Sequence, residues 1–169
     1  PRLIFINKMD RPGADYHRSM ETIRKRLKGN PVPVCVPVDN QIVNLIDQEV
    51  LQFSGDQGEI VTRTPLSEEL IAATAEHRET MLLCAADFDP SLEDVVLEGG
   101  DADPALVRAA LRVGTIAGKI HPCFAGSALR NWGVQTVLDA VIGLLPAPKD
   151  RPSTMGVAVK TESQETIEM

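Results

Sequence analysis

The chain has 169 residues, 43% of them hydrophobic, and a formal net charge of −7 at pH 7. This length and composition exclude a disordered chain and predict one good core or two small ones. The acidic balance argues against a broad RNA-binding surface, which needs clustered Lys and Arg. No stretch is long and apolar enough to span a bilayer, so we expect no membrane partner.

The chain holds only Cys35, Cys84 and Cys123, which are far apart in the sequence. This odd and scattered set is typical of a reducing cytosol and excludes a close-spaced zinc site. No signal peptide precedes the first predicted strand. We therefore expect a cytoplasmic location and no metal ligands.

The first predicted strand, residues 3–6, ends abruptly in the polar loop Asn-Lys-Met-Asp at residues 7–10. The Asp10 carboxylate can accept two parallel hydrogen bonds from the ring N–H and the exocyclic amine of guanine, which adenine does not offer. The Lys8 stem can lie against the base plane while its ammonium stays hydrated. A four-residue pattern also recurs by chance, so an ordinary polar loop is the alternative.

A helix is predicted over residues 16–28, with Asp15 as its N-cap and Gly29 at its end. Its outer face carries five basic or imidazole side chains: His17, Arg18, Arg24, Lys25 and Lys28. A solvated face with cations near the helix C-terminus is favoured over a patch for ribosomal RNA or a partner protein.

Residues 31–63 are predicted to form a small antiparallel sheet of short strands. Its first strand, residues 32–38, carries Pro33 and Pro37 between valines, and proline in a strand indicates an edge strand or an irregular one. Helices are predicted over residues 67–86, 90–97 and 103–118, with acidic outer faces. His77 lacks a second ligand at helical spacing, which favours a surface histidine over a metal site.

The next predicted strand, residues 120–125, ends in the small residues Gly126, Ser127 and Ala128. Small residues let the backbone approach a ligand, so the Ala128 N–H could donate to the guanine carbonyl oxygen. Leu129 could pack on the base or the ribose. The last helix is predicted over residues 134–145, with a continuous apolar stripe of Val134, Val137, Leu138, Val141, Ile142 and Leu145.

Three motifs resemble those of translational GTPases, most closely the elongation factor G family. Residues 7–15 resemble its fourth guanine-nucleotide motif, and residues 126–135, Gly-Ser-Ala-Leu-Arg-Asn-Trp-Gly-Val-Gln, resemble its fifth motif. Residues 29–34, Gly-Asn-Pro-Val-Pro-Val, resemble a run that lies between them. Leu129 replaces the Phe of the family pattern. The resemblance covers about residues 1 to 150.

The resemblance implies roles for the matching residues. Asp10 would select the base, Lys8 would stack on it, Asn7 would support the loop, and Ser127 and Ala128 would bind the base carbonyl. The chain has no Gly-rich phosphate loop and no recognisable switch, so phosphate and Mg²⁺ binding would need a missing N-terminal part. We therefore expect a fragment that binds GTP or GDP through the base only and does not hydrolyse GTP alone.

The predicted fold is α/β, a partial parallel sheet of the P-loop GTPase type made from its last two strands and their helices, with an inserted α+β subdomain. Residues 1–30 and 119–148 would form the distal GTP-binding domain, and residues 31–118 the insert, which resembles the family's G′ subdomain. Residues 149–169 would be a linker and the possible start of the next domain, with a strand-like run at residues 156–160.

The resemblance implies a ribosome-associated GTPase that drives translocation of tRNA and mRNA, with the insert docking the ribosomal stalk protein. Three alternatives remain. The chain could act only as a protein-binding module through its insert. It could also be the same region of a GTPase that resembles peptide-release factor three or of a ribosomal protection protein, although the wording of the motifs favours elongation factor G over both.

Overall fold

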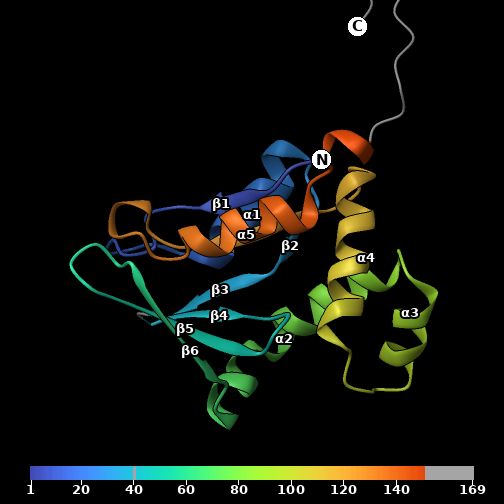
Figure 1. Ribbon diagram of the computed structural model, residues 1–169, viewed down its shortest axis with the longest axis horizontal. Coiled ribbons are helices and arrows are strands. Elements are labelled where there is room, and N and C mark those ends of the chain that lie inside the picture. Colours follow the sequence, from blue (N-terminus) through green and yellow to red (C-terminus); the bar gives the residue numbers. More distant parts are fainter. Residues whose placement is uncertain (40, 151–169) are drawn as a thin grey trace, which may run out of the picture.

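The structure is a computed structural model that describes residues 1–39 and 41–150. The strand-like run predicted at residues 156–160 lies outside the described residues. The described part contains two sheets flanked by helices (Figure 1), in agreement with the predicted fold class.

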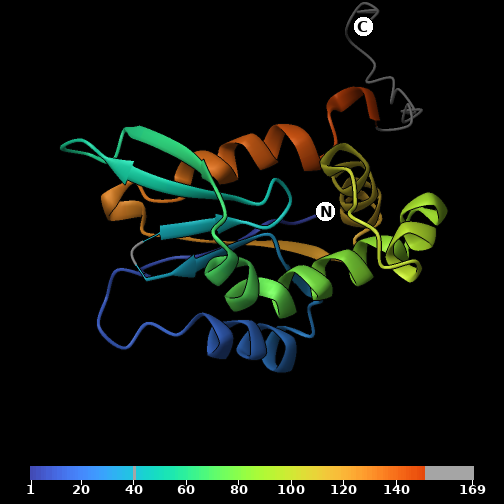
Figure 2. The ribbon, with the colours of Figure 1, turned by 90° about the horizontal axis from the view of Figure 1, so that it is seen from below.

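The first sheet is parallel and has three strands in the order β1-β7-β2. Strand β1 (Ile4–Ile6) pairs with β7 (His121–Ala125), and β2 (Pro31–Pro33) pairs with the other edge of β7. Every residue of β7 is buried, as expected for the central strand of a parallel sheet covered on both faces. Helices α1 (Tyr16–Leu27) and α5 (Val134–Leu144) lie on opposite faces of this sheet (Figure 2).

The second sheet is antiparallel, in the order β3-β4-β5-β6, and lies within residues 31–118, the predicted insert. Its strands are β3 (Cys35–Val38), β4 (Gln41–Asn44), β5 (Glu49–Ser54) and β6 (Ile60–Pro65). Three helices complete the insert: α2 (Glu68–Ala86), α3 (Pro90–Leu97) and α4 (Pro104–Ile116). Two short 3₁₀ helices, η1 (Ala128–Arg130) and η2 (Pro148–Asp150), lie nearer the carboxyl end of the chain.

Local sequence signals explain where the helices start. The side chains of Asp15, Ser67 and Asp103 each accept a hydrogen bond from a backbone N–H in the first turn of the helix that follows. Such caps satisfy donors that have no partner within the helix. At the end of α1, Lys28 rather than Gly29 takes the left-handed conformation, with φ 49°.

The prediction that residues 32–38 form one strand of the small sheet is wrong. The chain instead passes from the parallel sheet to the antiparallel sheet at Val34, whose N–H donates to the Cys123 carbonyl and whose carbonyl accepts from Leu45 N–H. The alternation of valines continues across this junction because both sheets bury them. The parallel sheet therefore has three strands rather than two, and β2 lies at its edge, as the prolines indicated.

One continuous core joins the two sheets. It includes Val32 and Phe124 of the parallel sheet and Val43 and Leu51 of the insert. The apolar stripe predicted on the last helix faces outward for much of its length, because α5 packs through Ala140 and Leu144 instead. Leu138, Val141 and Ile142 of that stripe are exposed.

Candidate functional site

Two loops meet at the carboxyl ends of β1 and β7. Because these strands are parallel neighbours, the loops that follow them emerge at the same edge of the sheet. Backbone hydrogen bonds join the loops directly. Gly126 N–H donates to the Ile6 carbonyl at 3.1 Å, and Met9 N–H donates to the Gly126 carbonyl at 3.0 Å. Residues 7–10 and 126–129, far apart in the sequence, therefore form one surface.

The Asn7 side chain links the two loops. Its Oδ1 accepts the Lys8 N–H at 2.7 Å and the Ala128 N–H at 2.9 Å. The Ala128 N–H, expected from the sequence to be available for a base carbonyl, thus has a protein partner in this structure. Asn7 thus connects the second loop to the first, and its role in base binding stays a prediction.

The carboxylate of Asp10 lies at the junction of the loops, and its side chain is only 7% exposed. The nearby Ser127 hydroxyl is the largest influence that lowers the pKa of Asp10 below its ordinary value; Arg11 and Arg130 act in the same direction, while burial opposes them. The Ser127 hydroxyl is buried and has no partner at hydrogen-bond geometry within the described residues. The Asp10 carboxylate, beside the Ser127 hydroxyl, has the acceptor capacity to bind donors of a ligand.

Lys8 and Leu129 extend from the two loops into solvent. Lys8 adopts φ +66°, a left-handed conformation that is uncommon for a residue with a side chain. The Leu129 side chain, in η1, is 82% exposed. The structure therefore brings Asn7, Ala128, Asp10 and Ser127 together and leaves these two side chains uncovered at the edges.

Arg130 and Trp132, to which the sequence assigned no part in base recognition, lie beside Asp10 and Ser127. Arg130 Nε lies 3.4 Å from Asp10 Oδ2, and its guanidinium stacks over the Trp132 ring at 5.2 Å from the centroid. Trp132 also exchanges two backbone hydrogen bonds with Ser127. A Cβ on Gly126 would overlap the Trp132 carbonyl, so only glycine fits there. The fifth motif contains Arg130 and Trp132, but the contact between Arg130 and Asp10 can be seen only in the folded structure.

The chain is similar to known proteins over most of its length. Residues 1–147 match the family described as "Elongation factor Tu GTP binding domain". The chain belongs to this family. Elongation factor G 1 of Geobacter sulfurreducens is 41% identical over 174 residues, an alignment that covers 99% of this chain and 25% of that protein. The chain thus spans a quarter of the length of this relative.

A solved structure supports the fold. A crystal structure of a protein from Thermus thermophilus matches with a TM-score of 0.73 at 21% identity, covering 89% of this chain and 23% of that one. This likeness supports the predicted fold class, and the family match confirms the resemblance seen in the sequence motifs.

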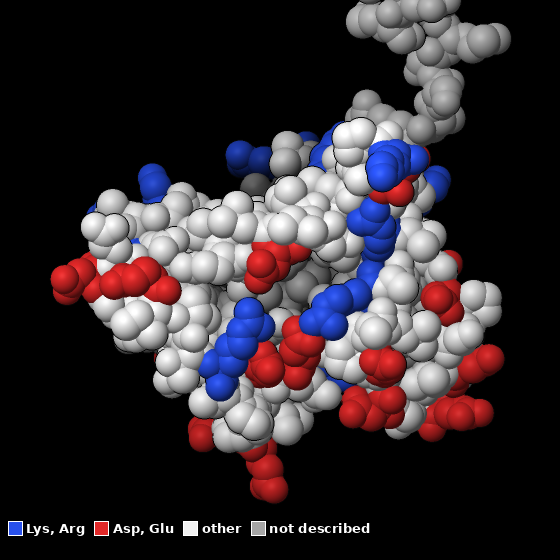
Figure 3. All heavy atoms as spheres, in the orientation of Figure 1, with Lys and Arg blue, Asp and Glu red and all other residues white. Residues whose placement is uncertain are grey.

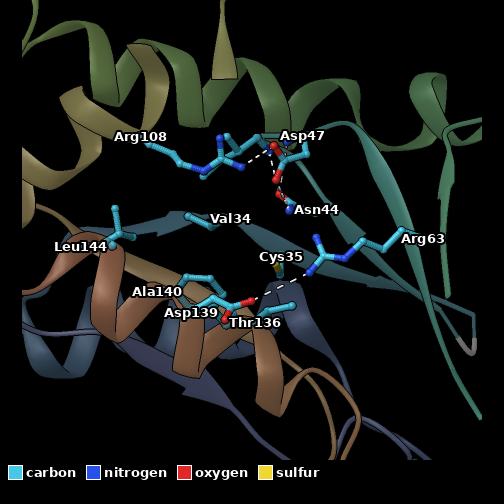
Figure 4. Close-up of a pocket in the computed structure, with 13 residues that line it drawn as sticks. Val34, Cys35, Asn44, Asp47, Arg63, Arg108, Thr136, Asp139, Ala140 and Leu144 are labelled. Carbon is cyan, nitrogen blue, oxygen red and sulfur yellow. Dashed lines mark hydrogen bonds and ion pairs between the residues drawn. The ribbon is translucent and has the colours of Figure 1, made fainter. Parts of the chain in front are cut away.

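A separate cavity of about 180 Å³ lies between α5 and the antiparallel sheet of the insert (Figure 4). Arg63 reaches Asp139 across it at 3.9 Å, and Arg108 pairs with Asp47 on another wall. Burial raises the pKa of the Cys35 thiol in its lining to about 12, so this thiol is not a nucleophile at neutral pH. The two arginines and the two aspartates of the lining balance each other in charge.

The titratable groups outside the two loops do not form a metal centre in the described part of the chain. Within residues 1–39 and 41–150, no three His, Cys, Asp or Glu side chains are grouped to hold an ion. His77, predicted to be a surface residue, is half-buried and packs edge-on against Tyr16, with ring centroids 5.7 Å apart. None of the described helices is long and apolar enough to cross a membrane.

Proposed function

We propose that this chain is the guanine-recognition half of the GTP-binding domain of a translational GTPase. The observation that carries the proposal is the bond from Ala128 N–H to Asn7 Oδ1, which joins the two loops beside Asp10. Asp10 would accept the ring N–H and the amine of guanine. Its ion pair with Arg130 involves a half-exposed guanidinium, so exchanging that partner for a base costs little.

The other site residues would complete the recognition of the base. Lys8 would cover one face of the ring with its methylene stem, and Leu129 would contact the base or the ribose. The carbonyl oxygen of guanine would be bound at Ser127 and Ala128. The Ala128 N–H already donates to Asn7, so Asn7 would share or release it when the base enters.

Phosphate and Mg²⁺ contacts would come from residues outside this chain, because its sequence has no Gly-rich phosphate loop. A single bidentate base contact provides about 1–3 kcal/mol. We therefore expect the 169-residue chain to bind GDP more weakly than about 1 mM and to show no GTPase turnover. Tight binding of GDP but not ADP by this chain would contradict the proposal.

The whole protein is proposed to act in protein synthesis. The relative from Geobacter sulfurreducens is named an elongation factor G, and its likeness to this chain supports GTP-driven translocation of tRNA and mRNA on the ribosome, in the cytoplasm. The base-recognition loops of the chain would then keep adenine nucleotides from driving that step.

The decisive experiment is Asp10→Asn in the protein at its native length. The substitution turns one carboxylate acceptor into a donor, so the preference for GDP over XDP should fall by at least about 100-fold and reverse toward xanthine. Calorimetric titration with GDP, XDP and ADP measures this. Leu138→Asn, on the exposed face of α5, is the control and should keep the preference for guanine. Unchanged selectivity in Asp10→Asn would refute the role of Asp10.

A second candidate function is docking of the ribosomal stalk protein on the insert. A groove of about 510 Å³ runs between α2 and α3 and is lined by apolar side chains that include Ile71, Leu83 and Leu97. All three are exposed, and acidic side chains surround α3 on the face shown in Figure 3. An apolar groove with a charged rim is typical of a protein-binding surface.

The two candidate functions can be separated with the same protein. The Asp10→Asn variant should bind the stalk-protein C-terminal domain as the wild type does, whereas Leu97→Asp should weaken that binding by about tenfold or more. Ile142→Asp places the same charge on an exposed residue of α5, outside the groove, and should leave binding intact. Equal binding by all variants would exclude the groove as the docking surface.

A further inference from the structure

The turn between β5 and β6 belongs to the insert but lies against the second loop of the site. Gly58 is buried, while its neighbours Gly55, Asp56, Gln57 and Glu59 are exposed. Gly58 has φ +65°, and a Cβ on it would overlap the carbonyl oxygen of Arg130. The backbone of the turn and the backbone of η1 are therefore in direct contact, and no side chain fits between them.

A side chain of α5 adds a second contact at the same place. Gln135 Nε2 donates to the Gly58 carbonyl at 3.4 Å, while its buried Oε1 has no partner among the described residues. The Trp132 ring carbon Cδ1 lies 3.4 Å from the position that a Gly58 Cβ would take. The turn thus touches η1, Trp132 and the start of α5 together.

The turn keeps its shape through its own hydrogen bonds. Glu59 Oε2 accepts the Gln57 N–H at 2.9 Å. Backbone N–H groups of Glu59 and Gln57 hold the pKa of the Glu59 carboxyl below its ordinary range, so the carboxylate is charged at neutral pH. A turn that is ordered before contact can support a neighbouring loop without a further loss of entropy.

The supported loop is the one that carries the base contacts. Arg130, whose carbonyl faces Gly58, also places its guanidinium 3.4 Å from Asp10 Oδ2. Ala128, in the same turn of η1, donates to Asn7 across the two loops. A displacement of the Arg130 backbone would therefore change two of the links between the loops, the Arg130–Asp10 ion pair and the Ala128–Asn7 hydrogen bond.

We propose that the β5–β6 turn holds the loop at residues 127–132 in its guanine-binding geometry, with Gly58 and Gln135 as positioning residues. The insert is then part of the nucleotide site and not only an appended docking surface. This inference rests on the proposed guanine recognition, and it adds a segment of the chain that contacts no base.

The test is Gly58→Ala in the protein at its native length. The new methyl group forces the turn and η1 apart, so GDP affinity should fall about tenfold. Hydrogen exchange of the Ala128 amide, followed by NMR in the absence of nucleotide, should speed up by a similar factor. This exchange reports the Asn7–Ala128 bond itself, which a loss of overall stability alone would not change selectively.

Gly118→Ala is the matched control. Gly118 also has a left-handed φ, +69°, but a Cβ there meets nothing within 4 Å. The control therefore carries the same backbone strain without the clash, and its GDP affinity and Ala128 exchange should stay within about twofold of the wild type. Gln135→Met, which removes the donor to Gly58 together with the unpaired Oε1, should weaken GDP binding about threefold.

The outcomes separate this inference from the proposed function. If Gly58→Ala does not fold, Gln135→Met carries the test by the same two measurements. GDP affinity and Ala128 exchange unchanged in either folded variant, or equally changed in Gly118→Ala, would overturn the positioning role. A wild-type protein that fails to distinguish GDP from ADP would instead overturn guanine recognition. The Ala128 exchange, measured without nucleotide, would then still test whether the turn holds the loop at residues 127–132.

Discussion

The parallel sheet and the antiparallel sheet share one hydrophobic core but expose their polar groups in different places. All of β7 is buried, so polar groups near this strand can reach solvent only in the loops at its ends. Five of the six residues of β6 are exposed, and its polar side chains lie in the middle of the strand, at residues 62–64. A parallel sheet thus confines its chemistry to the ends of its strands, whereas the insert can contact partners along a face.

The largest expected effect tests whether the shared core makes the two regions one folding unit. Leu111 of α4 is 0% exposed, and Leu111→Ala should lower the free energy of unfolding by about 2–5 kcal/mol because it leaves a cavity. Urea unfolding, followed by circular dichroism and by amide signals of both sheets, should show a single transition.

Leu97→Ala is the control for this prediction, because Leu97 is 78% exposed and the change should cost less than about 0.5 kcal/mol. Two separate transitions in Leu111→Ala, with the parallel sheet unaffected, would show that the insert folds independently.

An intermediate effect is expected at the ends of the parallel strands. Asn7→Ala removes the acceptor for two backbone N–H groups at exposed positions, where water can replace that acceptor. GDP affinity should fall about tenfold or more, while the free energy of unfolding falls by no more than about 1 kcal/mol, because Asn7 is exposed. Nucleotide titration and urea unfolding of the same samples measure the two effects.

Gln52→Ala, an exposed polar residue of β5, is the matched change in the antiparallel sheet and should leave both quantities unaltered. A loss of stability in Asn7→Ala as large as its loss of affinity would mean that the loops serve the fold rather than the ligand.

The smallest expected effect concerns pH at the contact between α1 and α2. Burial lowers the pKa of His77 below its ordinary value of 6.5; His17 and Arg24 act in the same direction, while Glu76 opposes them. The unfolded chain therefore takes up the proton first as the pH falls, so this stability is complete above pH 6.5 and is lost as the pH drops through the lower folded pKa.

Thermal melts between about pH 7.5 and 5 should show this loss, and His77→Gln should reduce it. Asp10, whose folded pKa is lowered below 3.8, should keep its charge over the same range, so GDP binding should stay constant where stability changes. A pH dependence of stability that persists in His77→Gln would assign it to other groups.

The sequence predicted the parts of the fold that local chemistry determines. Asp15 was expected as a cap and acts as one, and Ser67 and Asp103 cap helices whose starts were predicted at these residues, because a side-chain acceptor at a helix start depends only on its neighbours. The change of sheets at Val34 was missed because hydrophobic alternation does not reveal which sheet a strand joins. The exposed face of α5 was missed because an apolar stripe does not specify its partner.

The candidate site shows the same limit. Asn7, Asp10, Ser127 and Ala128 were predicted from their motifs, and the structure places them together, although their roles stay predictions. Arg130 beside Asp10 and Gly58 beside η1 could not be predicted, since both depend on contacts between segments distant in the sequence. Glycine in a hairpin turn normally indicates only a backbone conformation.

Trp132 is the only tryptophan of the chain, and it lies between the β5–β6 turn and the loop that carries Ser127 and Ala128. Its ring is stacked under the guanidinium that pairs with Asp10. Exchanging that guanidinium for a base would change the electrostatic environment of the indole and therefore its emission. The chain thus contains an intrinsic optical probe next to its candidate site, so ligand entry can be timed by stopped-flow fluorescence without a label.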